Sequence, residues 1–138
     1  MMVSTKGRYA LRTTVRLASL APETYLTLRD LSEQEDISEK YLEVIMKALV
    51  KAGLVVGLRG KGGGYRLSRP ADRITAADVL RVTEGSLAPA ACLAPDAPQC
   101  HQREACPVLS MWKEYYWLTE HFFEGKTLRQ LACQEKKV

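Results

Sequence analysis

The stretch from Ser38 to Arg69 constrains the fold most, because it predicts a helix that leads directly into a two-stranded hairpin. Ser38 is a residue type that caps helix N-termini, and Gly53 is one that ends helices. Four apolar residues recur between them at helical spacing and form the expected buried stripe: Leu42, Ile45, Met46 and Leu49. Residues 54–58 and 65–68 then follow the period of two that is typical of strands, on either side of a glycine-rich turn.

A helix followed by a basic hairpin is typical of a winged helix-turn-helix, in which the helix enters the DNA major groove and the wing contacts the backbone or minor groove. The hairpin tip could instead be an unrelated phosphate-binding or mobile loop. A Walker loop is disfavoured because Lys61 is followed by Gly62 and a strand, and a dinucleotide fingerprint starting at Gly60 fails at Tyr65. The candidate DNA-binding residues lie on the helix, the hairpin and the start of the chain: Ser38, Lys40, Tyr41, Glu43, Lys47, Arg59, Lys61, Gly62, Tyr65, Lys6 and Arg8.

The distribution of charge supports a nucleic-acid partner. The 138-residue chain has a formal net charge of +4; residues 1–84 hold 14 Lys and Arg against 10 Asp and Glu, whereas residues 85–138 hold 6 against 6. The basic excess therefore surrounds the predicted DNA-binding segment, as phosphate anchoring requires. We recognise no signal peptide and no apolar run of membrane length, so we expect a cytoplasmic protein without a membrane partner.

Capping signals place the other helices. We expect one helix over residues 9–21, a short second helix capped by Thr27 and Asp30, and a fourth capped by Thr75 and Asp78. The predicted fold is mainly α with a small β-hairpin wing: a winged helix-turn-helix domain over residues 1–85, a cysteine-bearing loop over 86–106, and a long dimerisation helix with a short C-terminal helix over 107–138.

The long helix is predicted to begin at Pro107, with Cys106 at its cap, and to end near Glu124. Its apolar residues cover more than one stripe, and so short a chain has few elements left to bury them. We expect a homodimer that binds a palindromic double-stranded operator; the alternative is a helix buried wholly within one chain. Five aromatic residues are the expected dimer contacts: Trp112, Tyr115, Tyr116, Phe122 and Phe123.

Three cysteines, Cys92, Cys100 and Cys106, lie in or beside the one long irregular segment. Their wide spacing disfavours a structural zinc site, but thiolates are the usual ligands of iron–sulfur clusters. His101 could supply a fourth ligand, with Glu104 as another candidate.

A DNA-binding thiol redox switch without a cluster is the main alternative, because Cys106 at a helix N-terminus would gain thiolate character. Other readings are inert buried thiols, an adaptor that keeps the fold without binding DNA, and an enzyme. The enzyme is disfavoured because Cys100 and His101 have no evident orienting acid. Cys133 is expected to be a packing residue.

Several of these motifs together resemble the iron–sulfur cluster regulator (IscR-type) family of bacterial transcription factors. The matching residues are Thr5–Ala10, Ile37–Glu43, Leu54-Val55, Arg59-Gly60, Gly62–Tyr65 and the cysteine trio. The resemblance implies a homodimer whose Cys92, Cys100 and Cys106 hold a cluster, usually 2Fe–2S, with the iron–sulfur assembly machinery as a further partner. It also implies that Glu43 tunes operator preference and that Arg59 enters the minor groove.

The sequence departs from that family at the cluster loop. The first cysteine interval is two residues longer than in its best-known members, and Leu109 stands where they carry a ligand histidine. Nitric-oxide-sensing relatives use an N-terminal acid at the position of Arg8, which cannot bind iron. The fourth ligand is therefore unassigned by the resemblance.

Overall fold

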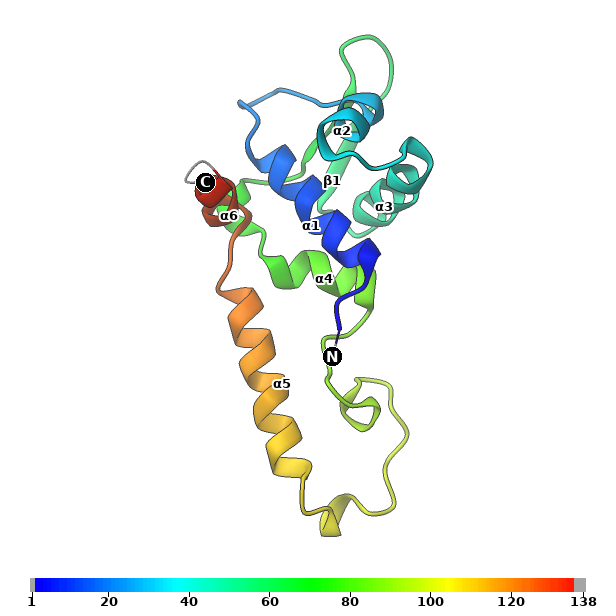
Figure 1. Cartoon of the computed structure of the whole chain (residues 1–138), viewed down its shortest axis with the longest axis vertical. Helices are drawn as coiled ribbons and strands as arrows, with labels where there is room; N and C mark the ends of the chain where they lie inside the picture. Colours follow the sequence, from blue (N-terminus) through cyan, green and yellow to red (C-terminus); the bar gives the residue numbers. More distant parts are fainter. Residues whose placement is uncertain (1, 136–138) are drawn as a thin grey trace.

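The computed structural model describes residues 2–135; Met1 and residues 136–138, which belong to the first and last predicted segments, lie outside the described residues. Six α-helices, three short 3₁₀ helices (labelled η) and one antiparallel hairpin make up the described fold (Figure 1), which confirms the predicted mainly α architecture with a β-hairpin wing. In chain order the elements are α1 (Thr5–Ala18), α2 (Leu28–Glu35), α3 (Glu39–Lys51), β1 (Val55–Leu58), β2 (Gly64–Leu67), η1 (Ala71–Arg73), α4 (Ala76–Glu84), η2 (Ala91–Leu93), η3 (Arg103–Ala105), α5 (Leu109–Glu124) and α6 (Leu128–Glu135). Within this part of the chain, no helix combines the length and apolar character needed to cross a membrane.

Local capping explains where most helices begin. The Ser38 hydroxyl accepts a hydrogen bond from the Tyr41 N–H, and Thr27 and Thr75 form the predicted capping boxes with Asp30 and Asp78. The first helix starts at Thr5, four residues before the predicted start, because the Ser4 hydroxyl caps the Gly7 N–H at 3.0 Å. Polar residues 5–8 carry no apolar period, so periodicity alone misses this first turn.

The predicted start of the long helix is wrong by two residues. α5 begins at Leu109, and Val108 precedes it without any side-chain capping bond. Cys106 instead follows η3, and neither Cys106 nor Pro107 supplies a capping oxygen. The thiol of Cys106 therefore does not sit at the N-terminus of α5, which removes the helix-dipole argument for its thiolate character.

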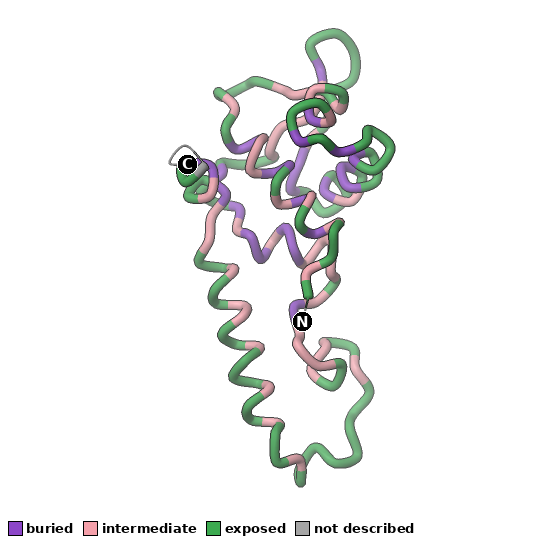
Figure 2. The backbone as a smooth tube through the Cα atoms, in the orientation of Figure 1, coloured by how far each residue is buried: buried purple, intermediate pink, exposed green. Residues whose placement is uncertain are grey.

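The core surrounds α1 and is built from both ends of the chain. Leu17, Leu42, Ile45 and Leu49 are buried together with Leu128 of α6. Backbone bonds also tie this C-terminal helix to the domain: the Leu128 N–H donates to the Ile74 carbonyl at 2.9 Å. Figure 2 shows the buried positions concentrated in this domain, whereas α5 and the segment before it are mainly half-buried or exposed.

The hairpin is attached to the domain by a third backbone segment. Within it Val55 pairs with Leu67 and Leu58 pairs with Gly64. Leu26, in the link between α1 and α2, then forms an antiparallel bridge to Tyr65, with N–O distances of 2.7 and 3.0 Å. The base of the wing is thus fixed, and its tip projects beyond it (Figure 1).

Candidate nucleic-acid interface and cysteine loop

The outer face of α3 presents the predicted DNA-binding side chains. Lys40, Tyr41, Glu43 and Lys47 are all exposed, opposite the buried stripe. Glu43 and Lys47 form an ion pair at 3.3 Å one turn apart. Ser38 is exposed but its hydroxyl is engaged as the helix cap. This face is therefore free to enter a groove, and it carries two exposed carboxylates one turn apart, Glu39 and Glu43.

Tyr41 is supported by a set of side chains that sequence patterns did not reveal. Its ring meets the ring of Tyr9 edge to face at 5.6 Å, and the Arg12 guanidinium lies 5.6 Å from the Tyr9 ring centre. Arg12 also donates to the backbone carbonyl of Glu35 at 2.6 Å, and Arg16 pairs with the buried Glu35 carboxylate at 2.7 Å. This network joins α1, α2 and α3, so it fixes the orientation of the recognition face.

The wing tip carries exposed Arg59, Lys61 and Gly62. Gly60 and Gly62 have φ of +95° and +79°, a backbone region that favours glycine, and the Gly63 N–H closes the turn onto the Gly60 carbonyl at 3.0 Å. Tyr65, also a predicted DNA contact, is half-buried against the core instead of standing at the tip. Its position holds the wing to the domain.

Lys6 and Arg8 lie in the first turns of α1, at the opposite end of the domain from the wing tip (Figure 1). Beside them Ser4 binds the Glu84 carboxylate twice, through its N–H at 2.6 Å and its hydroxyl at 2.7 Å. Burial alone would raise the pKa of Glu84, but these hydrogen bonds and the charge of Lys6 outweigh it and lower the pKa below its ordinary value. An ionised Glu84 therefore joins the start of α1 to the end of α4.

The structure does not gather the cysteine trio. Cys92, Cys100 and His101 are exposed and Cys106 is half-buried in the segment between α4 and α5. Across residues 2–135, no three His, Cys, Asp or Glu side chains are grouped so that they could hold a metal ion. The thiols have the right chemistry for an iron–sulfur group but not a preformed arrangement. Cys133, expected to be a packing residue, is exposed on α6.

α5 carries two apolar stripes with different surroundings. Tyr116 and Phe123 pack toward α4 against Ala77, Leu80 and Leu87. Arg81 of α4 strengthens this contact, because it pairs with Glu124 at 2.6 Å and with Glu120 at 3.9 Å. The hydrogen bond to Glu124 raises the pKa of Arg81.

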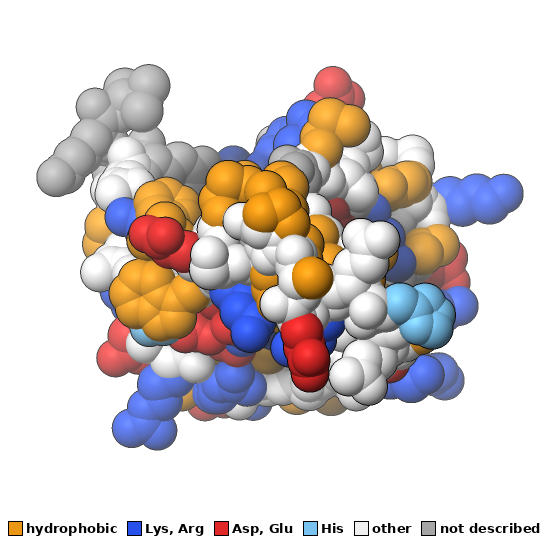
Figure 3. Space-filling model, turned by 90° about the horizontal axis from the view of Figure 1, so that it is seen from below, with side chains coloured by type: hydrophobic (Ala, Val, Ile, Leu, Met, Phe, Trp, Pro, Cys, Tyr) orange, Lys and Arg blue, Asp and Glu red, His pale blue; other side chains and the backbone are white. Residues whose placement is uncertain are grey.

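The second stripe of α5 is exposed. Four large apolar side chains recur along it at intervals of four, three and four residues, with 44–58% of their surface accessible: Met111, Tyr115, Leu118 and Phe122. Figure 3, which views the molecule from below, shows hydrophobic side chains gathered on this face among charged ones. The predicted dimer contacts are thus divided between the stripes: Tyr115 and Phe122 are on the exposed one, Tyr116 and Phe123 face α4, and Trp112 is half-buried. A heptad count over residues 111–122 would have separated the stripes and added Met111 and Leu118.

Comparison with known proteins gives one family. The Rrf2 family, described as iron-dependent transcriptional regulators, matches residues 3–134. The chain is 34% identical to the HTH-type transcriptional regulator IscR of Aliivibrio salmonicida, over 99% of this chain and 80% of the relative. It is 41% identical to the HTH-type transcriptional regulator CymR of Bacillus subtilis, over 96% and 90% of the two chains.

Solved structures agree with these sequence matches. The structure of B. subtilis CymR, the global cysteine regulator, superposes with a TM-score of 0.79 and 34% identity over 97% of this chain and 98% of that one. The oxidized form of Staphylococcus aureus CymR gives a TM-score of 0.74 and 30% identity over 96% of each chain. The superpositions confirm the predicted winged fold. The relatives' names confirm the prediction of a transcriptional regulator that is not an enzyme.

Proposed function

The chain belongs to the Rrf2 family of DNA-binding transcriptional regulators, and we propose that it works in the cytoplasm as a homodimer whose operator binding is controlled by its cysteine loop. One arrangement carries the DNA-binding part: the exposed face of α3 stands on the Tyr9–Arg12–Glu35 network beside a glycine-rich basic wing tip. A rigidly held helix for the major groove and a cationic tip for the backbone or minor groove are what a winged DNA-binding domain needs.

The exposed stripe of α5 supports the dimer. Its four side chains repeat with heptad spacing over three turns, which is the pattern of a helix that packs along a second helix. A second copy of this chain would bury the stripe and present two α3 faces related by a two-fold axis. Such a dimer would bind a palindromic operator.

The cysteine loop supports control by an iron–sulfur cluster. Cys92, Cys100 and Cys106 would hold the cluster, with His101 as the fourth-ligand candidate in the same loop. A bound 2Fe–2S group would supply redox and oxygen sensitivity. Because the thiols are separated in the described structure, loading by the assembly machinery would have to order the loop beside α5.

An anaerobic purification tests this part. We expect a visible absorption spectrum with matched iron and acid-labile sulfide, lost in the Cys92→Ala/Cys100→Ala/Cys106→Ala variant and retained in Cys133→Ala. Colourless protein after chemical reconstitution, or a Cys133→Ala variant that loses the colour equally, would contradict it.

A thiol switch without a cluster is the second candidate, and the exposure of Cys92 and Cys100 favours it because exposed thiols are open to oxidants. The resemblance to a relative whose structure exists in an oxidized form points the same way. Under this proposal, mild peroxide changes DNA affinity in metal-free protein, and mass spectrometry finds oxidised Cys92 or Cys100. If the metal-free protein keeps the same affinity after oxidation, the switch is excluded.

A further inference from the structure

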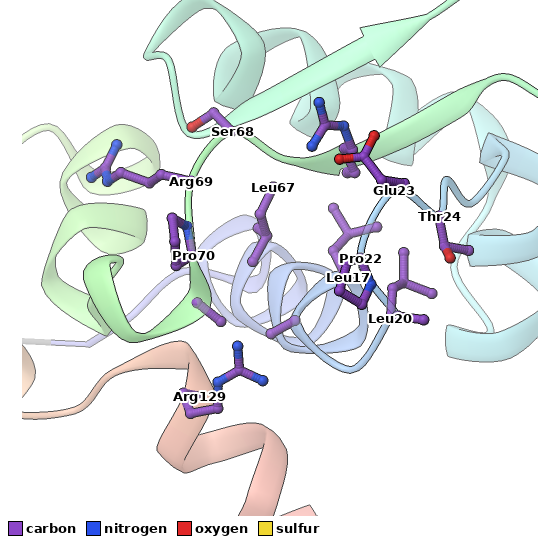
Figure 4. Close-up of a pocket in the computed structure, with 14 residues that line it drawn as sticks. Leu17, Leu20, Pro22, Glu23, Thr24, Leu67, Ser68, Arg69, Pro70 and Arg129 are labelled. Carbon is purple, nitrogen blue, oxygen red and sulfur yellow. The ribbon is translucent and has the colours of Figure 1, made fainter.

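A pocket that no part of the proposed DNA or cysteine machinery uses lies between α1, the base of the wing and α6 (Figure 4). Its volume is about 490 Å³, within the range of about 300–1,000 Å³ typical of small-molecule sites. None of its lining residues belongs to α3 or to the cysteine loop. A ligand in it would therefore touch the wing base and the C-terminal helix at the same time.

The floor and walls of the pocket are largely apolar. Leu17, Ala18 and Ala71 are buried at its base, and Leu67 and Leu20 are half-buried. Apolar lining with a few polar groups at the rim is the usual composition of sites that bind small organic molecules. This surface fits a short hydrocarbon body.

Three arginines and one acid lie around the pocket, and their partners differ. Arg66 donates to the Tyr25 hydroxyl at 2.9 Å. Arg69 donates to the Arg73 carbonyl at 3.1 Å and lies 3.7 Å from the Asp78 carboxylate. Arg129 has no hydrogen-bond or ion-pair partner among the described residues, and Figure 4 shows it reaching from α6 toward the α1 side, whereas Arg69 points away from the middle. Arg129 is therefore the guanidinium that is free to bind an anion.

We propose that this pocket binds a small monocarboxylate with a short apolar body, its carboxylate paired with Arg129 and its hydrocarbon on the leucine and alanine floor. The planar fork of a guanidinium matches a carboxylate with two parallel hydrogen bonds. A multiply charged phosphate fits less well, because Arg66 and Arg69 already have acceptors and the Glu23 carboxylate lies at the same rim. The site is independent of the cluster proposal, so either can fail alone.

Residue-resolved titration tests the site. We would titrate the full-length ¹⁵N-labelled protein with hexanoate at pH 7 and follow amide shifts. The proposal predicts saturable shifts at residues 67–71 and around Arg129, with a dissociation constant on the order of 1 mM. Hexanamide, which lacks the charge, and acetate, which lacks the apolar body, should each bind at least about tenfold more weakly.

Three variants separate this site from general anion binding. Arg129→Gln should weaken hexanoate binding at least about tenfold, as expected for a lost charge-assisted hydrogen bond. Arg103→Gln, an exposed arginine in η3, should leave it unchanged, and Glu23→Gln should tighten it by removing a like charge. Equal binding of hexanamide, equal affinity in Arg129→Gln, competition by inorganic phosphate at the same concentration, or shifts confined to α5 would overturn the proposal.

Discussion

The contact between α1 and α4 depends on the carboxylate of Glu84. It accepts two hydrogen bonds from Ser4, and its pKa is lowered from the ordinary 4.5. A lowered pKa in the folded state means that this contribution to stability is complete above the unfolded-state pKa. It is lost as the pH falls through the folded-state value.

Glu84→Gln should therefore lower the free energy of unfolding by about 1 kcal/mol at pH 7, since hydrogen bonds to a charged acceptor become neutral ones. At a second, acidic pH below the lowered folded-state pKa the parent carboxyl is protonated, so the difference should shrink. Urea unfolding at both pH values measures this, with the exposed Glu114→Gln as the matched control. An equal difference at both pH values would show that the effect is packing and not charge.

Glu43 is the residue most suited to reject wrong operators. It is exposed on α3, and a carboxylate in the major groove can accept from cytosine N4 but repels phosphate. Glu43→Ala should broaden the sequences selected from a random duplex pool and reduce the affinity ratio between best and unrelated sites about five- to tenfold.

The control for Glu43 is Glu33→Ala on α2, which breaks a similar exposed pair with Arg29. Its selected sequences should match those of the parent. If Glu43→Ala selects as narrowly as the parent protein, Glu43 does not set operator preference.

At the scale of elements, the wing depends on backbone that only glycine allows. Gly64 has φ of +136°, and a Cβ there would overlap the Leu26 carbonyl that receives the Tyr65 N–H. Gly60 has φ of +95° but open space around a Cβ. The two positions therefore separate backbone strain from steric overlap.

Gly64→Ala should cost on the order of 3 kcal/mol of stability, because the wing must leave Leu26 or shift, whereas Gly60→Ala should cost about 1 kcal/mol for strain alone. Denaturant unfolding of both variants is the measurement. Equal costs would mean that the bridge between Leu26 and Tyr65 does not hold the wing.

The exposed stripe of α5 gives a prediction about assembly. Leu118→Arg places a charge in the middle of the stripe and should weaken the proposed dimer at least about 100-fold, because an unpaired charge would have to be buried. Lys113→Glu reverses an exposed charge on the side of the helix away from the stripe and should leave the dimer intact. Sedimentation velocity distinguishes monomer from dimer; a monomeric parent, or a dimeric Leu118→Arg, would contradict the assignment.

Features written locally in the sequence were predictable. Ser38, Thr27 and Thr75 cap helices through residues three positions away, so their side chains and spacing suffice. The start of α5 was missed because no capping side chain marks it.

Features that depend on packing between distant segments were not predictable. Whether Tyr115 or Tyr116 faces α4 depends on where α4 lies, and the contact of Tyr9 with Tyr41 joins two helices through the tertiary fold. The Arg129 pocket joins α1, the wing base and α6 in the same way.

At the scale of the whole molecule, the cysteine segment and α5 together link α4 to α6, and both of these helices belong to the same domain. α6 returns to pack beside α1, while α5 and the cysteine segment extend away from that domain (Figure 1). Arg81 and the stripe of Tyr116 and Phe123 bind this extension to α4, whose last residue, Glu84, contacts Ser4. Ordering of the cysteine segment can therefore affect the DNA-binding domain through the packed side chains of α5 and α4. The proposed regulation of DNA binding depends on these contacts.

The most direct test is the affinity for a duplex selected by the protein, measured anaerobically by fluorescence anisotropy at several salt concentrations. We would compare the loaded parent with the Cys92→Ala/Cys100→Ala/Cys106→Ala variant and use Cys133→Ala as the control. We expect an affinity that falls steeply with salt in all three proteins and differs at least about tenfold between the loaded parent and the triple variant. Equal affinity of those two proteins would show that the cysteine loop does not control DNA binding.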